Sequence, residues 1–271
     1  MKFANLNGTT LRYRVSGDQN GPALIFVNSL GTDLTMWDEV VEQFPAEYRI
    51  IGYDKRGHGL SALRDSELPE GRLRISDLAN DLLALADHLN IAEFAVCGVS
   101  VGGMIAQTVA AIAPERVSGI VLCNTGAKIG PAPVWDERIA AIKADGLAAQ
   151  ADTVMERWFT PAFREAESAK LAGYRAMLAQ TSTAGYLATC AAIRDADLTK
   201  SSSALKLPVL CIAGADDLAT PPQMVQALSD LIEGAVYHEI PQCGHLPSVE
   251  QPDVCAALII TFMVDLEVRT G

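Results

Sequence analysis

The sequence of 271 residues is poor in basic residues and contains no cluster of them. Its 21 lysines and arginines stand against 33 aspartates and glutamates, which gives a formal net charge of −12. Proteins that bind nucleic acids through the phosphate backbone use clustered Lys and Arg to release counterions. We therefore do not expect a nucleic acid as a partner.

The chain also lacks the pattern of a secretion signal. Its first ten residues, MKFANLNGTT, contain no basic region followed by an apolar one. An uncharged stretch at residues 94–114 is long enough to span a bilayer, but it contains three glycines and has no basic flank to orient it. We expect a cytoplasmic protein with no membrane partner, in which this stretch is a buried strand followed by a buried helix.

The six cysteines are scattered singly, without a CxxC or other metal-ligand spacing. Cys97, Cys123 and Cys211 lie in apolar runs, where a thiol packs as a small hydrophobic group. We therefore expect neither a structural disulfide nor a metal site.

Hydrophobic residues make up 49% of the chain, enough for a substantial core. An Asn7-Gly8 turn predicts a hairpin of residues 3–6 and 10–15. Short apolar runs then alternate with helical patterns, and they predict strands covered on both faces at residues 23–27, 49–53, 94–98, 119–123, 209–213 and 236–240. This alternation predicts an α/β fold with a mostly parallel, doubly wound sheet.

The alternation stops between about residues 125 and 203. Four helical patterns follow one another there, at residues 134–143, 147–158, 162–178 and 184–193. This insert has nine basic and nine acidic residues, so the net charge of −12 lies on the rest of the chain. We expect an α/β core domain formed by residues 1–125 and 204–271, with an inserted helical domain at residues 126–203.

The strongest motif for chemistry is Gly98-Val99-Ser100-Val101-Gly102, which matches the pattern GxSxG. It follows an apolar strand and opens a buried helix, as in an elbow that holds a serine hydroxyl above a sheet. The glycines stand where a side chain would collide, and the amide groups at the helix N-terminus face a developing oxyanion. Ser100 is the predicted nucleophile.

A serine nucleophile needs a base that is oriented by an acid. After Ser100, His245 lies in a glycine-flanked loop, whereas His238 lies inside an alternating strand and is expected to face solvent. We predict His245 as the base. Asp216 and Asp217 follow the preceding strand, and only one of them can meet the imidazole because adjacent side chains point in different directions.

At this point the chain resembles the α/β-hydrolase superfamily over essentially its whole length. The resemblance rests on the order of Ser100, the aspartate pair and His245, on DKRGHGLS at residues 54–61, and on GHLPSVEQP at residues 244–252. It implies that the helical insert is a cap and that Asp217 is the acid, because Asp217 has the family's spacing from Pro221. His58 is then a structural loop residue rather than a second base.

The segment NSLGTD at residues 28–33, followed by Met36-Trp37, is similar to the 3-oxoadipate enol-lactonases of the β-ketoadipate pathway. This resemblance implies that the backbone N–H groups of Leu30 and Val101 form the oxyanion hole. Many relatives have His-Gly where this chain has Asn28-Ser29. Whether Ser29 takes the backbone geometry of that glycine and binds substrate, or is a turn residue only, stays open at this stage.

The implied reaction is hydrolysis of 3-oxoadipate enol-lactone to 3-oxoadipate through an acyl-enzyme, without a metal or cofactor. The substrate is a small anionic lactone, and a neutral cap suits an anion better than the acidic core does. Trp135 and Arg138 share a helix face and are the predicted carboxylate site, with Arg157 and Trp158 as a second option. The alternative is a solvated arginine and a tryptophan that packs in the core.

Other functions remain open. A general carboxylesterase and a carbon–carbon bond hydrolase of aromatic catabolism would share the same triad. A non-catalytic ligand-binding member of the fold would have lost a triad position, and none is lost. The sequence does not specify the ring substituents of the lactone. It is compatible with a monomer and with a homo-oligomer.

Overall fold

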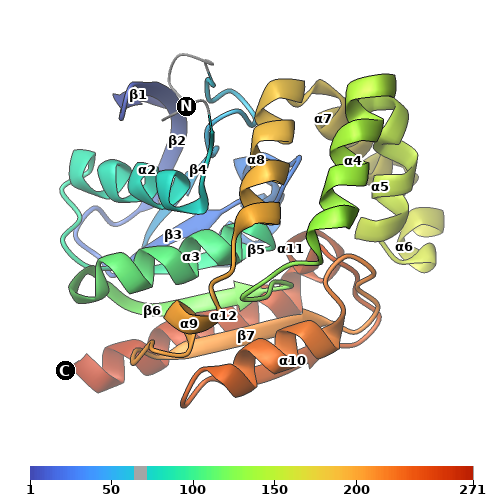
Figure 1. The fold of residues 1–271 in the computed structure, drawn as a ribbon. Coiled ribbons are helices and arrows are strands. Elements are labelled where there is room, and N and C mark those ends of the chain that lie inside the picture. Colours follow the sequence, from blue (N-terminus) through green and yellow to red (C-terminus); the bar gives the residue numbers. More distant parts are fainter. Residues whose placement is uncertain (64–71, 271) are drawn as a thin grey trace.

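A computed structural model of the protein describes residues 1–63 and 72–270. Within them the chain forms one eight-stranded sheet in the order β1-β2-β4-β3-β5-β6-β7-β8 (Figure 1). The strands are β1 (Lys2–Leu6), β2 (Thr9–Gly17), β3 (Ala23–Val27), β4 (Arg49–Tyr53), β5 (Phe94–Val99), β6 (Val117–Cys123), β7 (Val209–Gly214) and β8 (Val236–Ile240). Every strand lies where the sequence predicts one.

The sheet is parallel from β4 to β8, and only β2 runs against its neighbours. Asn7 and Gly8 connect β1 to β2 with φ angles of 50° and 78°. A two-residue hairpin turn of this kind requires φ above zero at both positions, which Asn and Gly adopt most readily. The predicted α/β fold with an antiparallel edge is confirmed.

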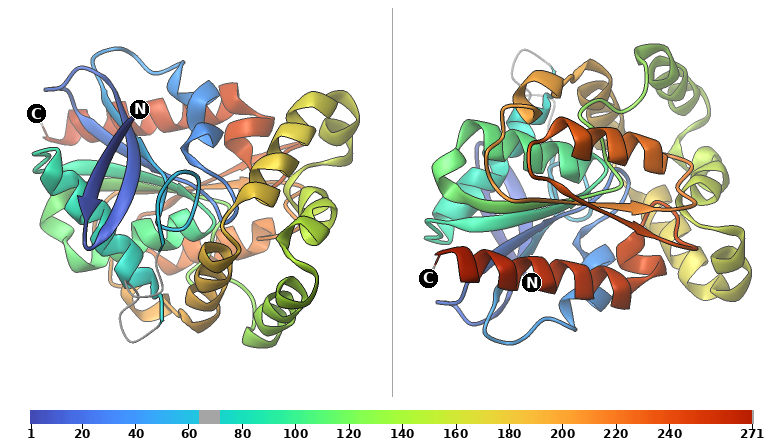
Figure 2. Two further views of the ribbon diagram at one scale, coloured as in Figure 1. Left: turned by 90° about the horizontal axis from the view of Figure 1, so that it is seen from above. Right: turned by 90° about the horizontal axis from the view of Figure 1, so that it is seen from below.

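Helices cover both faces of the sheet (Figure 2). The helices α2 (Ile75–His88), α3 (Val101–Ile112) and α10 (Pro222–Leu231) lie on one face, and α1 (Asp38–Val41) and α12 (Pro252–Thr270) lie on the other. The short helix α11 (Pro247–Glu250) precedes α12, and short 3-10 helices occupy Leu34–Trp37 and Pro114–Arg116. The arrangement is that of a doubly wound sheet.

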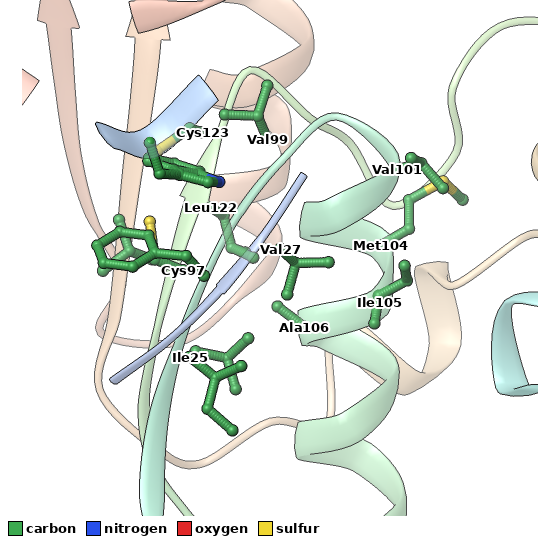
Figure 3. Close-up of a cluster of buried hydrophobic side chains, with 14 of the residues drawn as sticks. Ile25, Val27, Cys97, Val99, Val101, Met104, Ile105, Ala106, Leu122 and Cys123 are labelled. Atoms are coloured by element: carbon green, nitrogen blue, oxygen red, sulfur yellow. The ribbon is translucent and has the colours of Figure 1, made fainter. Parts of the chain in front are cut away.

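The uncharged stretch at residues 94–114 forms β5 and most of α3. All six residues of β5 are buried, and α3 is buried along most of its length. Figure 3 shows the result, with Ile25, Val27 and Leu122 on the side of the sheet that faces α3 and Cys97 on the opposite side. None of the helices in the described part of the chain is long and apolar enough to cross a membrane. All six cysteines are buried and free.

The strand order places a topological switch point at β3 and β5. The chain continues from β3 to β4 on one side and returns to β5 on the other side. In open α/β sheets, ligands bind beyond the carboxyl ends of the strands at such a point. Val27 pairs with Gly98 in the sheet, so the loop after β3 lies next to the turn after β5.

A group of helices stands over this edge of the sheet (Figure 1). They are α4 (Ala132–Asp145), α5 (Ala151–Trp158), α6 (Pro161–Ala166), α7 (Ser168–Gln180) and α8 (Thr183–Asp195), with a 3-10 helix at Leu147–Gln150 and the short α9 (Thr199–Ser202) leading back to the sheet. The single helix predicted at residues 162–178 is wrong. The chain forms two helices there, separated at Glu167, whose φ of −111° and ψ of 48° are not helical.

Candidate active site

Ser100 stands on a sharp turn between β5 and α3, with φ 58° and ψ −118°. A Cβ atom at Gly98 would lie 2.2 Å from the carbonyl carbon of Gly102, and one at Gly102 would lie 2.5 Å from the carbonyl oxygen of Val27. The elbow therefore closes only with glycine at both positions. The Thr125 hydroxyl holds it by donating to the carbonyl of Ser100 at 2.6 Å.

Asp217 and His245 meet at the ends of β7 and β8. The Asp217 Oδ2 atom lies 2.8 Å from Nδ1 of His245, and both side chains are buried. Asp217 also accepts hydrogen bonds from the backbone N–H groups of Ala219 and Thr220, at 2.7 and 3.0 Å, and from the Thr220 hydroxyl at 2.6 Å. The carboxylate is thus held in one orientation toward the imidazole.

The other titratable candidates lie elsewhere. Asp216 and His238 are exposed. His58 is buried, and its Nδ1 lies 3.3 Å from the carbonyl oxygen of Arg56. Burial and the nearby charge of Lys55 lower the pKa of His58 well below its usual value.

Asn124 connects the loops that carry Asp217 and His245, and the sequence reasoning missed it. Its Oδ1 accepts from the N–H of Gly214 at 2.7 Å, and its Nδ2 donates to the carbonyl of Gly244 at 2.8 Å. It is buried and has a φ of 44°, a conformation that Asn tolerates better than most residues. The sequence offers one signal for Asn124, since it is a polar residue that directly follows the apolar strand β6.

Glu250 connects the loop that carries His245 to the cap. The sequence reasoning missed this residue as well. Its carboxylate accepts from the N–H of Gly244 at 2.9 Å and from the N–H of Thr160 at 3.0 Å, and it also binds the Thr160 hydroxyl. The N–H of His245 donates to the carbonyl of Trp158 at 2.8 Å. Burial raises the pKa of Glu250 although these hydrogen bonds act against it.

The loop after β3 brings Leu30 beside the elbow. Among the described residues, the N–H groups of Leu30 and Val101 donate to no protein acceptor. Ser29 does not adopt the left-handed conformation; Gly31 does, with φ 78°. The Ser29 hydroxyl is buried and has no hydrogen-bond partner among the described residues. The Asn28 side chain donates through Nδ2 to the carbonyl of Thr32 and accepts through Oδ1 from the N–H of Lys55 at 3.3 Å.

A cavity of about 110 Å³ is lined by these groups. Its walls include Ser29, Leu30, Ser100 and His245 from the core, and Trp135, Arg138, Arg157, Trp158 and Tyr186 from the cap. Sites for drug-sized ligands measure about 300–1,000 Å³, so this one suits a small molecule. A larger groove of about 1090 Å³ lies between α6 and the loop after β7, but it reaches neither Ser100 nor His245.

The cap wall of the cavity carries unneutralised positive charge. Within the described residues, Arg138 and Arg157 form no ion pair, whereas the other arginines of the cap do: Arg164 with Glu156, Arg175 with Asp152, and Arg194 with Asp136 and Asp195. Burial raises the pKa of Tyr186 to about 12, and both cavity arginines act in the opposite direction.

Trp135 orients one of these arginines. The guanidinium carbon of Arg138 lies 5.2 Å from the centre of the Trp135 ring, a cation–π arrangement. The indole Nε1 donates to the carbonyl of Ile129 at 2.6 Å, which fixes the ring. The pair predicted from its helical spacing is thus formed, and both members line the cavity.

The chain matches the family described as alpha/beta hydrolase fold over residues 22–252. It is 40% identical over 242 residues to 3-oxoadipate enol-lactonase 2 of Acinetobacter baylyi, covering 89% of this chain and 88% of that protein. It is 31% identical to 3-oxoadipate enol-lactonase 1 of the same organism over 265 residues, 98% of this chain and 97% of that protein. The crystal structure of the enol-lactonase from Burkholderia xenovorans LB400 superposes with a TM-score of 0.92 at 36% identity, covering 97% of this chain and 100% of that chain. The chain belongs to the α/β-hydrolase family, in the branch that contains the 3-oxoadipate enol-lactonases.

Proposed function

We propose that the protein hydrolyses 3-oxoadipate enol-lactone to 3-oxoadipate, a step in the catabolism of aromatic compounds. The supporting observation is the small cavity that Ser100 and His245 line together with two arginines, neither of which forms an ion pair with any described residue. A lactone with a free carboxylate needs both features at once. The enol-lactonase relatives support the same substrate.

The reaction proceeds in two halves. In the first, His245 takes the Ser100 proton as the hydroxyl attacks the lactone carbonyl, and Asp217 holds the imidazole and stabilises its charged form. The N–H groups of Leu30 and Val101 stabilise the tetrahedral oxyanion. Collapse of the intermediate opens the ring, and the leaving enolate takes the proton from His245 and tautomerises to the 3-oxo group.

In the second half, His245 activates a water molecule that attacks the acyl-enzyme. The same two N–H groups stabilise the second oxyanion, and 3-oxoadipate leaves as Ser100 regains its proton. Each step uses the side chains and backbone of this chain alone.

The cap, which we assign to residues 126–203, selects the substrate. Arg138 binds the free carboxylate, and Trp135 packs against the lactone ring. Ser29 offers the substrate a hydroxyl that is left unpaired in the part of the chain that the structure describes. Arg157 is the second cation within reach and the alternative holder of the carboxylate.

The direct test is loss of the ultraviolet absorbance of the enol-lactone on addition of the protein, together with loss of that activity in Ser100→Ala. The kcat/KM for the enol-lactone is compared with those for p-nitrophenyl acetate and for a ring-cleavage diketone. We expect the enol-lactone to be preferred by orders of magnitude.

Each alternative has its own outcome. Activity on the aryl ester with none on the lactone would indicate a general carboxylesterase, and preference for the diketone a carbon–carbon bond hydrolase. Failure of a fluorophosphonate probe to label Ser100 would indicate a non-catalytic member of the fold.

A further inference from the structure

The peptide between Ser29 and Leu30 is held by several hydrogen bonds to its carbonyl oxygen. The Ser29 carbonyl oxygen accepts from the Lys55 ammonium at 2.5 Å, from the Thr32 hydroxyl at 3.0 Å and from the Thr32 N–H at 3.3 Å. The Asn28 Nδ2 adds a longer contact at 3.4 Å. The oxygen therefore receives several donors at once, and one of them is the side chain of a buried lysine.

These hydrogen bonds fix the peptide plane and so determine where the N–H of Leu30 points. In a trans peptide the carbonyl and the following N–H are coplanar and point in opposite directions. No cis peptide bond occurs in the described chain. With its oxygen turned into the core toward Lys55, the peptide turns its N–H the other way, toward the cavity that Leu30 lines.

Lys55 itself is buried, at 1% exposed, and forms no ion pair within the residues that the structure describes. The neighbouring Asp54 directs its carboxylate to other donors: the N–H groups of Leu34 and Leu60 and the Arg12 guanidinium. Among the described residues, the Lys55 Nζ donates to the carbonyl of Ser29 and, at 3.5 Å, to that of Asn28. A buried lysine without a carboxylate partner is costly, and burial lowers its pKa accordingly.

We propose that Lys55 is a positioning residue for the reaction, strengthening the oxyanion hole through the Ser29–Leu30 peptide. Donation to the carbonyl oxygen draws electron density away from the amide nitrogen, which makes the N–H of Leu30 a stronger donor. The same bond fixes the direction of that N–H before substrate arrives, so no reorganisation is needed as the oxyanion forms. The inference rests on the role of Leu30 in the proposed function.

Lys55→Met tests the inference, because Met has a similar length and volume but no donor. We expect kcat to fall about 10-fold with little change in KM, less than the roughly 100-fold that loss of an oxyanion-hole donor itself costs. A trifluoromethyl ketone that forms a tetrahedral adduct with the serine should lose affinity by the same factor. The affinity for 3-oxoadipate, which has no such oxyanion, should not change.

A milder variant removes a neutral donor from the same carbonyl. Thr32→Val should lower kcat about 3-fold in the same direction, by loss of one hydrogen bond. Thr108→Val is its matched control, because the Thr108 hydroxyl is also buried and donates to a carbonyl, that of Met104, away from the cavity. Thr108→Val should keep full activity, and Thr32→Val decides the test if Lys55→Met does not fold.

The inference is overturned if both variants keep the wild-type kcat, or if kcat falls while the affinity for the trifluoromethyl ketone does not. It is equally overturned if the affinity for 3-oxoadipate falls in step with kcat, since Lys55 would then shape the cavity in general. All rates are measured on the enol-lactone and on p-nitrophenyl acetate. If the wild-type protein does not hydrolyse the lactone, rates on the ester still test the role of Lys55. If Lys55→Met has no effect on kcat, the inference about Lys55 fails but the proposed lactonase function does not.

Discussion

Gly57, in the loop after β4, and Gly185, in the cap helix α8, pack backbone against backbone. A Cβ atom at Gly185 would lie 2.2 Å from the carbonyl oxygen of Gly57 and 2.6 Å from its Cα atom. The next residue of α8, Tyr186, lines the cavity. This contact between core and cap therefore helps to set the height of the cavity.

Gly185→Ala should destabilise the protein although alanine is the better helix former. A methyl group has no room between α8 and the Gly57 backbone, so α8 must shift, at a cost of about 1–3 kcal/mol. The kcat/KM for the lactone should fall with it. Gly173→Ala in α7 is the control: a Cβ atom there meets nothing within 4 Å, so only the gain in helix propensity of up to about 1 kcal/mol remains. Urea denaturation that ranked the two variants alike would contradict the contact.

Asp217→Asn should lower kcat by about 10⁴-fold, because an amide neither holds the imidazole in the correct tautomer nor stabilises its charged form. Asp216→Asn changes the same chemical group one residue earlier, on an exposed side chain, and should keep near-normal kcat. Steady-state kinetics on p-nitrophenyl acetate measures both. Equal losses in the two variants would refute Asp217 as the acid.

Arg138→Ala should raise KM for the anionic lactone about 10- to 100-fold, the usual worth of a charge-assisted hydrogen bond, and should change KM for a neutral ester far less. Arg175→Ala removes an equal charge from the cap but leaves the cavity intact, since Arg175 pairs with Asp152 on the surface. If Arg157→Ala selectively raises KM for the lactone while Arg138→Ala does not, the carboxylate belongs to Arg157.

Glu250→Gln should become more stable relative to the wild type as pH rises. Burial raises the pKa of Glu250 from its ordinary value of 4.5, so the folded protein holds this proton more tightly than the unfolded chain does. The wild type therefore loses unfolding free energy as pH rises from the ordinary value through the raised one, and glutamine does not. Urea denaturation at about pH 4 and pH 7.5 gives the two differences in unfolding free energy. Glu165→Gln, at an exposed position on α6, controls for the loss of one negative charge.

Much of the fold and the nucleophile elbow could be predicted because their signals lie in contiguous residues. Apolar runs mark the central strands β3, β5, β6 and β7, Asn7-Gly8 makes the hairpin turn, and the glycines around Ser100 stand where the chain bends too sharply for a side chain. Trp135 and Arg138 could be paired for the same reason, since helical spacing alone brings them together. The break between α6 and α7 was not predictable in this way, because no glycine or proline marks it.

The sequence by itself determined which segments become strands and helices and where the serine elbow forms, since these depend on local periodicity and backbone sterics. Tertiary structure decided which distant groups meet. Lys55 lies 26 residues from Ser29, and Asn124 lies 120 residues from Gly244. Their contacts exist only because the sheet order places β3 between β4 and β5, and β6 beside β7. No local pattern encodes that order, which arises from burying the whole sheet between its helices.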